Sequence, residues 1–353
     1  MTRQLKFYQA IHEATDLSLE RDPRVYLIGL GVPDPKGIFG TTLGLQEKYG
    51  PERVMDMPTA ENGMTGIAIG TAVSGMRPIM VFQRVDFALL ALDQIVNSAA
   101  KWHYMYGGKK TIPMVLRMII GRGWGQGAQH SQSLQSWFAH VPGLKVVMPA
   151  SPYDAKGLFL ASVEDNNTVI FLEHRWLHNT FGDVPAGYYQ VPLGKARVAR
   201  PGKDLTIVAT SHMVVEALHA ARLLSQVGVD VEVVDVRTLR PLDTQTILTS
   251  VAKTGRLLVA DTGWKVCGFA GEVLATVAEE GWESLKAQPR RLTLSDNPIP
   301  TSQALSIYCY PRTMDIVRTV CEMMGVPKDE VKTPQEISSV PGDIPDSSFA
   351  GPF

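Results

Sequence analysis

Short apolar runs separated by longer mixed segments dominate the first half of the chain. Runs of this length that are rich in Val, Ile, Leu and Met predict buried strands. The candidate strands are residues 25–29, 53–58, 79–82, 111–120, 145–148 and 169–172. Helix-like segments follow several of them, at 64–73, at 86–104 and after Ser151, where Pro152 and Asp154 mark a helix start. This alternation predicts a mostly parallel sheet covered by helices on both faces.

The second half of the chain shows the same alternation of strand-like and helix-like segments. Candidate strands lie at 204–209, 229–235 and 256–261, and candidate helices at 212–226, 269–280 and 310–324. A chain of 353 residues is too long for one core. We therefore predict an α/β protein of two domains. The predicted linker between them shows no apolar periodicity and carries Pro185, Gly187 and Pro192. The predicted boundaries are a first domain at 1–180, a linker at 181–194, a second domain at 195–325 and a surface tail at 326–353.

Composition narrows the function classes. The net charge is −1 and no basic stripe is present, so a nucleic-acid partner is not expected. No continuous apolar stretch is long enough to cross a membrane. The first residues lack the apolar run of a signal peptide, and acidic residues soon after them argue against a transit peptide, so we expect a cytoplasmic protein. The three cysteines form no close pair, which indicates neither a zinc site nor a disulfide framework.

One carboxylate stands out against this background. Glu61 lies between the strand-like run 53–58 and the small, uncharged helix-like run 64–73. A carboxyl group at such a place is close to apolar surroundings, which favours a proton-sharing hydrogen bond with a ligand. The ordinary alternative is a carboxylate that only complements the dipole of the helix that it begins. The residues alone leave both interpretations open.

Seven segments, in order and with ordinary spacing, resemble one known family. They are residues 44–54 (GLQEKYGPERV), 59–64 (TAENGM), 87–108, 129–133 (QHSQS), 138–147 (FAHVPGLKVV), 154–158 (DAKGL) and 237–243 (RTLRPLD). From Arg24 to about Met324 the chain is similar to the beta subunit of the decarboxylating component of thiamine-diphosphate-dependent 2-oxo acid dehydrogenases. This family includes the pyruvate, branched-chain 2-oxo acid and acetoin dehydrogenases. The resemblance implies a transketolase-like pyrimidine-binding domain followed by a transketolase C-terminal-like domain.

The resemblance also implies site residues. Family members place a Glu against a ring nitrogen of the cofactor's aminopyrimidine, where it promotes the imino tautomer, and Glu61 matches that position. Phe87 matches an aromatic residue that stacks on the ring. Thr59 and Gln83 match positions that line the ring, and both are polar where pyruvate dehydrogenases are usually apolar. His130 matches the active-site His of the beta subunit, and the pKa of a His suits proton transfer near neutral pH.

Further residues carry weaker implications. His140 matches a second recurring His, to which we assign a structural role. The glycine-rich segment 121–127 is expected to form an active-site loop ahead of His130. The resemblance also implies a potassium ion, which some members hold through backbone carbonyls at the positions of Met114, Ser162, Asp165 and Asn167.

A missing motif predicts a partner. In the family, the diphosphate and its divalent cation need a Gly-Asp-Gly loop with a downstream Asn, and this chain has no Gly-Asp-Gly. The resemblance therefore implies an alpha subunit that holds Mg2+ and completes the site in an α2β2 heterotetramer. The second domain would make the beta–beta contact and offer a surface to a lipoyl acyltransferase core.

One departure from the family bears on the substrate. Members usually follow the first strand with an acidic pair, whereas this chain has Leu30 and Gly31. The principal prediction is a beta subunit that supports oxidative decarboxylation of a small 2-oxo acid and acyl transfer to a lipoyl group. The alternative is a split, transketolase-like carboligase that transfers an acyl or ketol unit to a carbonyl acceptor. A non-catalytic interaction subunit is the third class, and intact Glu61, Phe87 and His130 argue against it.

Overall fold

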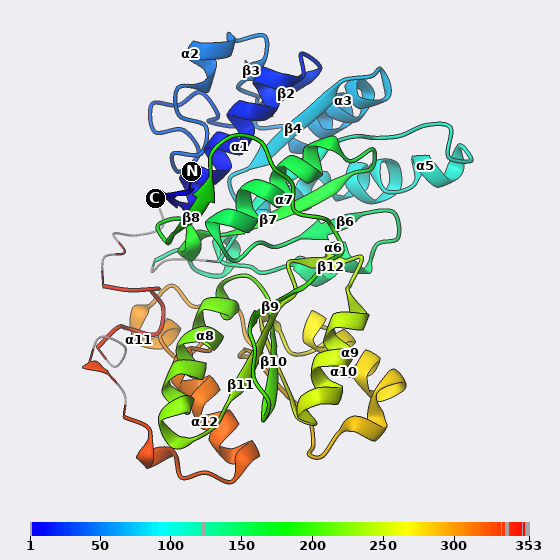
Figure 1. Cartoon of the computed structure of the whole chain (residues 1–353). Coiled ribbons are helices and arrows are strands. Elements are labelled where there is room, and N and C mark those ends of the chain that lie inside the picture. The colour runs from blue at the N-terminus through cyan, green and yellow to red at the C-terminus, as the bar shows by residue number, and fades with distance from the viewer. Residues whose placement is uncertain (1, 122–124, 333, 336–338, 348, 350–353) are drawn as a thin grey trace.

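The computed structural model describes the chain except residues 1, 122–124, 333, 336–338, 348 and 350–353. Two α/β halves lie one above the other in Figure 1. The sheet of the N-terminal half has seven strands in the order β12-β6-β7-β5-β4-β2-β3, all parallel except β12, which is antiparallel to β6. Their bounds are β2 (Val25–Gly29), β3 (Val54–Met55), β4 (Arg77–Phe82), β5 (Val115–Ile120), β6 (Lys145–Val147), β7 (Val169–His174) and β12 (Thr238–Arg240).

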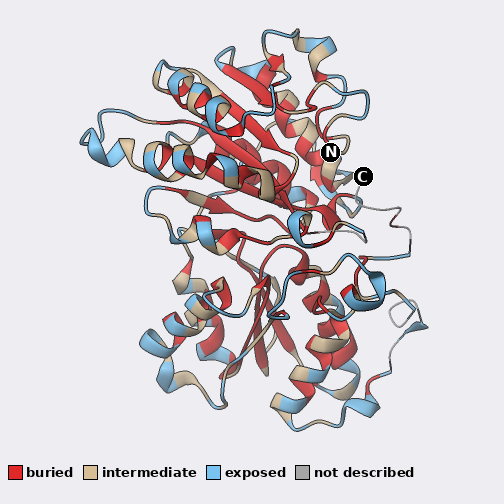
Figure 2. Ribbon diagram, turned by 180° about the vertical axis from the view of Figure 1, so that it is seen from behind, coloured by how far each residue is buried: buried red, intermediate tan, exposed pale blue. Residues whose placement is uncertain are grey.

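Helices cover this sheet, whose strands are almost wholly buried (Figure 2). They are α1 (Phe7–Arg21), α2 (Leu45–Tyr49), α3 (Glu61–Val73), α4 (Val85–Ala88), α5 (Trp102–Met105), α6 (Gln135–His140) and α7 (Pro152–Glu164). The single helix predicted over 86–104 is instead broken into α4, a 3-10 turn (Leu89–Ala91), a π-helical stretch (Gln94–Ala99) and α5. The Ala100 N–H donates to the Ile95 carbonyl oxygen at 3.0 Å, five residues back, and such a bond widens a helix.

The C-terminal half contains a five-stranded sheet in the order β14-β13-β10-β11-β9, of which β9 alone is antiparallel. Its strands are β9 (Arg197–Arg200), β10 (Leu205–Ala209), β11 (Val231–Asp235), β13 (Leu257–Trp264) and β14 (Arg290–Leu294). Its helices are α8 (His212–Leu224), α9 (Thr244–Thr254), α10 (Phe269–Glu280), α11 (Gln303–Ser306) and α12 (Thr313–Met324). The sequence analysis did not predict α9, although Asp243 caps it by accepting from the Thr246 N–H at 3.2 Å.

Strand β12 ties the halves together, and strands β1 (Thr2–Lys6) and β8 (Phe181–Pro185) add a small sheet to the first half. Strand β12 belongs to the second domain in sequence but extends the first domain's sheet. Strand β1 pairs antiparallel with β8, so the predicted linker 181–194 contains regular structure. The predicted surface tail packs more closely than expected, because Asp343, Ile344 and Phe349 are buried. Among the described residues, no helix has the length and apolar character that crossing a membrane requires.

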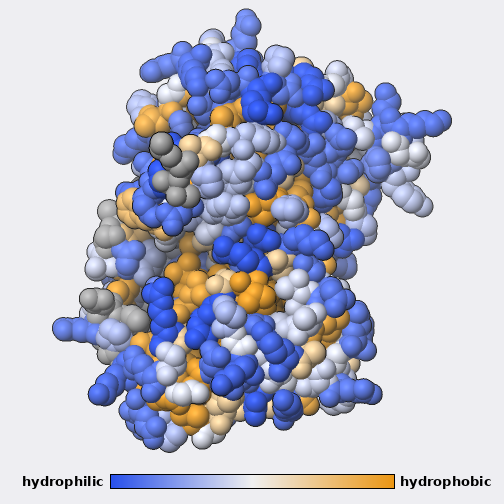
Figure 3. Space-filling view, viewed as in Figure 1, coloured by the Kyte–Doolittle hydropathy of each residue, from blue (hydrophilic) through white to orange (hydrophobic). Residues whose placement is uncertain are grey.

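The contact between the halves is partly apolar and partly charged. Hydrophobic residues gather in the band where the two halves meet (Figure 3), and one core cluster draws on both sheets. Within this contact, Asp154 of α7 and Asp235 at the end of β11 are both fully buried. The Arg197 Nη2 atom lies 3.4 Å from Asp154 Oδ2 and 3.5 Å from Asp235 Oδ2. Burial, and then the Asp154 carboxylate, raise the pKa of Asp235 to about 7, and Arg197 and Arg237 oppose this shift.

This shift predicts a pH dependence of stability. Between the unfolded pKa of 3.8 and about 7, the folded chain keeps a proton on Asp235 that the unfolded chain releases, so rising pH favours unfolding. Buried His174 and His178 have lowered pKa values, chiefly through burial, and give a slope of the opposite sign. We therefore expect D235N to gain stability over the wild type as pH rises through this window. Urea unfolding at a series of pH values measures the difference; exposed Asp296→Asn is the control and should track the wild type.

Candidate active site

The carboxyl edge of the N-terminal sheet borders a cavity of about 1120 Å³. Gln83 and Arg84 follow directly after β4, Arg175 follows β7, and His130 follows β5 after a loop. In parallel α/β sheets, ligands bind at this edge because the loops there converge. The lining also includes Tyr8, Asp34, Lys36, Phe39, Phe87, Gly125, Gln126 and His178.

Phe87 and His130, which are distant in sequence, are in contact in the cavity wall. Their ring centroids are 5.5 Å apart and the rings meet edge to face at 79°. Next to them, the Gln132 Nε2–H donates to Asp86 Oδ1 at 2.7 Å. Burial raises the pKa of Asp86, while the bond from Gln132 acts in the opposite direction. This bond fixes the loop that carries His130 to the helix that carries Phe87.

Gln83 lies against the segment that lacks the acidic pair. Its Nε2–H donates to the Leu30 carbonyl oxygen at 2.9 Å, and the Gly31 N–H donates to Asp56 Oδ1 at 2.9 Å. Gly31 has a φ of +73°, and a Cβ atom there would lie 2.8 Å from Gln83 Nε2. A carboxylate side chain at this position would be strained and would displace Gln83. The polar Gln83 and the Leu30–Gly31 departure are therefore two parts of one local structure.

Glu61 and Thr59 lie on the same edge but outside the lining of this cavity. They follow the short strand β3, and Glu61 is the first residue of α3, which packs against β4. The Glu61 residue is only 5 % exposed, whereas Thr59 is exposed. The structure thus brings Gln83, Phe87 and His130 together in one cavity. At the same sheet edge, it places Thr59 in the loop after β3 and Glu61 at the start of α3.

Two weaker predictions concern His140 and the glycine-rich segment 121–127. His140 is exposed at the end of α6, away from the cavity lining. Residues 122–124 of the predicted glycine loop lie outside the described residues, and Gly125 and Gln126 line the cavity.

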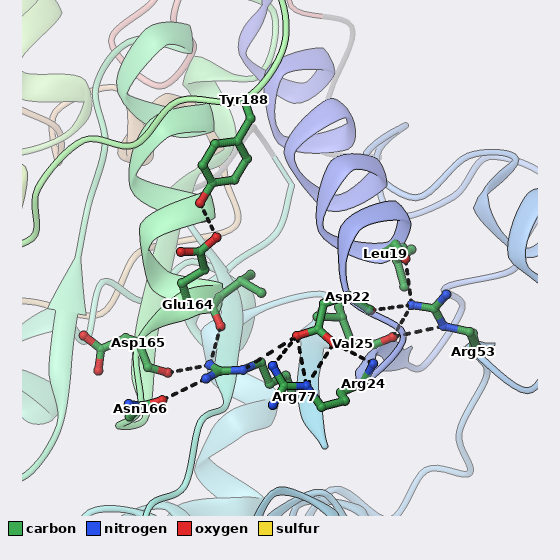
Figure 4. A network of polar contacts seen from close by, with 11 residues as sticks. Leu19, Asp22, Arg24, Val25, Arg53, Arg77, Glu164, Asp165, Asn166 and Tyr188 are labelled. Carbon is green, nitrogen blue, oxygen red and sulfur yellow. Dashed lines mark hydrogen bonds and ion pairs between the residues drawn. The ribbon is translucent and has the colours of Figure 1, made fainter. Parts of the chain in front are cut away.

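The loop predicted to hold potassium accepts hydrogen bonds from Arg77 (Figure 4). Arg77 Nη1–H donates to the Val163 and Asp165 carbonyl oxygens at 2.9 and 3.0 Å, and its Nη2–H donates to Asn166 Oδ1 at 2.8 Å. The Met114 carbonyl oxygen accepts from the Val169 N–H at 2.9 Å. Two of the four carbonyls expected to bind potassium therefore already accept hydrogen bonds, and the ion stays a prediction.

The sequence analysis missed Phe39, Arg84, Asp86 and Arg175, all of which lie in or beside the cavity wall. Arg84 and Asp86 lie between the recognised Gln83 and Phe87, so their position next to a strand end was the available signal. Arg175 has the same signal after β7. Nothing in the sequence marks Phe39.

The residues present fit the aminopyrimidine end of thiamine diphosphate. An aromatic ring, a side-chain amide and an imidazole share one cavity, and a nearly buried carboxyl begins the adjacent helix. Within the part of the chain that the structure describes, no three His, Cys, Asp or Glu side chains group as metal ligands do. The described residues therefore offer groups for an aromatic nitrogen heterocycle.

Comparison with known proteins defines the class. Residues 3–179 match the family model "Transketolase, pyrimidine binding domain", and residues 194–316 match "Transketolase, C-terminal domain". A solved split-gene transketolase, described as an inactive beta4 tetramer, superposes with a TM-score of 0.74 over 91 % of this chain and 99 % of its own, at 22 % identity. The fold is thus transketolase-like in both domains, as predicted.

Full-length relatives define the family. The beta subunit of acetoin:2,6-dichlorophenolindophenol oxidoreductase from Cupriavidus necator is 42 % identical over 92 % of this chain and 98 % of its own length. The beta subunit of the mitochondrial pyruvate dehydrogenase E1 component from Bos taurus is 39 % identical over 92 % of this chain and 91 % of its own. The chain belongs to the family of beta subunits of thiamine-diphosphate-dependent 2-oxo acid and acetoin dehydrogenases. This confirms the predicted family and favours it over the split carboligase.

Proposed function

We propose that this chain binds the aminopyrimidine of thiamine diphosphate and, with an alpha subunit, carries out oxidative decarboxylation of a small 2-oxo acid and acyl transfer to a lipoyl group. The observation that carries the proposal is the convergence of Gln83, Phe87 and His130 in one cavity at the carboxyl edge of the sheet. The family to which the chain belongs supports the same reaction.

Each site residue has a role in this proposal. When bound, thiamine diphosphate would supply a carbon nucleophile. Glu61 would hold a proton at a ring nitrogen, Phe87 would pack on the ring face, and Thr59 and Gln83 would orient its edge. His130 is held against Phe87 and moves a proton at the reacting end.

Partners complete the proposal. Because the relatives are named beta subunits, we assign this chain an alpha partner in an α2β2 heterotetramer, with Mg2+ bound by the alpha subunit. A lipoyl acyltransferase core, the potassium ion and a cytoplasmic location remain predictions.

Co-expression with the alpha subunit tests the function. The complex, supplied with thiamine diphosphate and magnesium, should reduce ferricyanide with at least one small 2-oxo acid. His130→Ala should lower kcat by about 10²-fold, the lower end of what a positioned proton-transfer group contributes. The matched control is His140→Ala, because His140 is exposed and lies outside the cavity lining. A complex that is inactive with every 2-oxo acid, or equal losses in both variants, would contradict the proposal.

A further inference from the structure

The end of the chain includes a buried segment that the matched family models do not cover. Those models match residues 3–179 and 194–316, and the segment 341–347 with Phe349 lies beyond both. After α12 the chain runs back along the second half towards the first half (Figure 1). Asp343 is fully buried, and Ile344 and Phe349 are each 9 % exposed. We call residues 341–347 together with Phe349 the C-terminal strap.

Polar contacts fix the strap to the second half. Arg312, directly before α12, donates to the carbonyl oxygen of Ile344 and, through Nη2–H at 3.0 Å, to that of Pro345. The Ser306 hydroxyl of α11 donates to Asp343 Oδ2 at 2.7 Å. Hydrogen bonds from or to a charged group are stronger than neutral ones. The strap is therefore held in one place on the second half.

The same arginine is connected to the first half. Its Nε–H donates to Glu216 Oε1 at 2.9 Å, and this oxygen also lies 2.9 Å from His212 Nε2. The His212 ring stacks on that of His174 at the end of β7, with ring centroids 5.1 Å apart. A Cβ atom at Gly121, the first residue of the predicted glycine loop, would lie 2.4 Å from His174 Cε1. A continuous series of contacts thus leads from the strap to the start of that loop.

Apolar side chains of the strap reach the cavity wall by a second route. Ile344 and Phe349 share a cluster with Trp176 of the first half and with four residues of the second half, Leu294, Ile299, Cys309 and Tyr310. The Phe349 ring centroid lies 5.5 Å from Arg175 Cζ, which in turn lies 4.6 Å from the ring centroid of Phe39. Such distances allow a cation–π attraction. Arg175 and Phe39 both line the cavity, so the strap contacts the cavity wall from behind.

We propose that the C-terminal strap positions the wall of the active-site cavity. It holds the 3-10 turn Arg175–Leu177 through Phe349 and Ile344, and it holds the start of the glycine loop through Arg312. Arg312 and Phe349 are positioning residues, because neither is among the described residues that line the cavity. The inference rests on the proposed function, whose reaction takes place in that cavity. A displacement of about 1 Å can cost about 10²-fold in rate even when its cause is far from the reacting atoms.

Turnover per bound thiamine diphosphate, measured on the complex with its alpha subunit, tests the inference. In Phe349→Leu and Arg312→Lys, kcat/KM for the 2-oxo acid that the wild type oxidises fastest should fall by about 10- to 100-fold. The lysine keeps the positive charge but lacks the fork of donors that spans several carbonyls. The matched controls are Tyr308→Leu, which is 79 % exposed and follows α11, and exposed Arg318→Lys of α12. Both controls should track the wild type.

A purely structural role gives a different result. It would lower the Tm and the yield of the complex and leave turnover per bound cofactor unchanged in Phe349→Leu and Arg312→Lys, and this outcome would overturn the inference. Phe349→Tyr keeps an aromatic ring against Arg175 and should retain most of the turnover that Phe349→Leu loses. Equal losses in the Tyr and Leu variants would show that the ring contact does not position the wall.

Hydrogen exchange separates this inference from the proposed function, because it needs no turnover. Backbone amides in residues 37–41 and 174–178 are hydrogen-bonded within the cavity wall, and they should exchange faster in Phe349→Leu than in Tyr308→Leu. Amides of the central strand β10 should exchange equally in both. If the cavity-wall amides respond in this way while no 2-oxo acid is oxidised, the strap stands and the proposed function fails. If exchange and turnover are the same in the two variants while a 2-oxo acid is oxidised, the strap is overturned and the proposed function stands.

Discussion

Glu61→Gln is expected to lower kcat of the complex by up to about 10⁴-fold, the upper end of what positioned proton transfer contributes. The substitution keeps the size of the side chain but removes its ability to take and return a proton. Glu61 begins α3 and is 5 % exposed, so little water can replace the lost carboxylate. Steady-state turnover, together with hydrogen–deuterium exchange at the reactive carbon of bound thiamine diphosphate, measures the effect. Both rates should fall together.

The ordinary interpretation of Glu61 gives a different result. If the carboxylate only complements the dipole of α3, Glu61→Gln should cost about 0.3–1 kcal/mol of stability and change turnover by a few-fold at most. Glu47→Gln is the matched control, because Glu47 also lies in the first turn of a helix but is exposed. Equal turnover of the two variants would show that Glu61 is structural.

The central strands β2, β5, β7, β10 and β11 could be predicted from sequence because each is a short apolar run that is buried along its length. Strands β8, β9 and β14 are partly exposed and were not predicted. Helix α1 could not, because its buried face includes Ala14, Thr15 and Ser18 besides larger apolar residues. Thr15 and Ser18 satisfy their hydroxyls within the helix, by donating to carbonyl oxygens four residues back at 2.9 and 2.7 Å. Strand β12 is three residues long and joins the sheet of the other domain, which no local pattern indicates.

Likewise, only some of the site residues could be found from the sequence. Glu61, Phe87 and His130 were found through resemblance, because each lies in a recognisable run. Arg84 and Arg175 were missed because an arginine after a strand is usually exposed, and only the fold shows that both strand ends border one cavity. The link between Gln83 and Gly31 depends on a backbone angle and a close contact that the sequence does not encode visibly.

A buried ion pair behind the cavity is expected to support the Phe39 loop. Arg117 of β5 and Glu173 of β7 are both fully buried and form an ion pair, in which Arg117 Nη2–H donates to Glu173 Oε2 at 3.1 Å. Arg117 Nη2–H also donates to Thr41 Oγ1 at 2.8 Å, and Thr41 follows Phe39 by two residues. Burial acts to raise the pKa of Glu173, but Arg117 and His178 together hold it below the usual 4.5. The stabilisation is therefore present at neutral pH and is lost as pH falls below 4.5.

Arg117→Met should destabilise the chain by about 3–5 kcal/mol, because it leaves the Glu173 carboxylate buried without its main partner. The double variant Arg117→Met/Glu173→Leu should regain most of this stability, since apolar residues of similar volume replace a buried pair at little net cost. It should not regain full activity, because Thr41 still lacks the donor that fixes the Phe39 loop to the sheet. Urea unfolding and ferricyanide turnover of the same preparations separate the two effects. A double variant that is stable and fully active would show that the ion pair serves the fold alone and that the cavity wall does not depend on it.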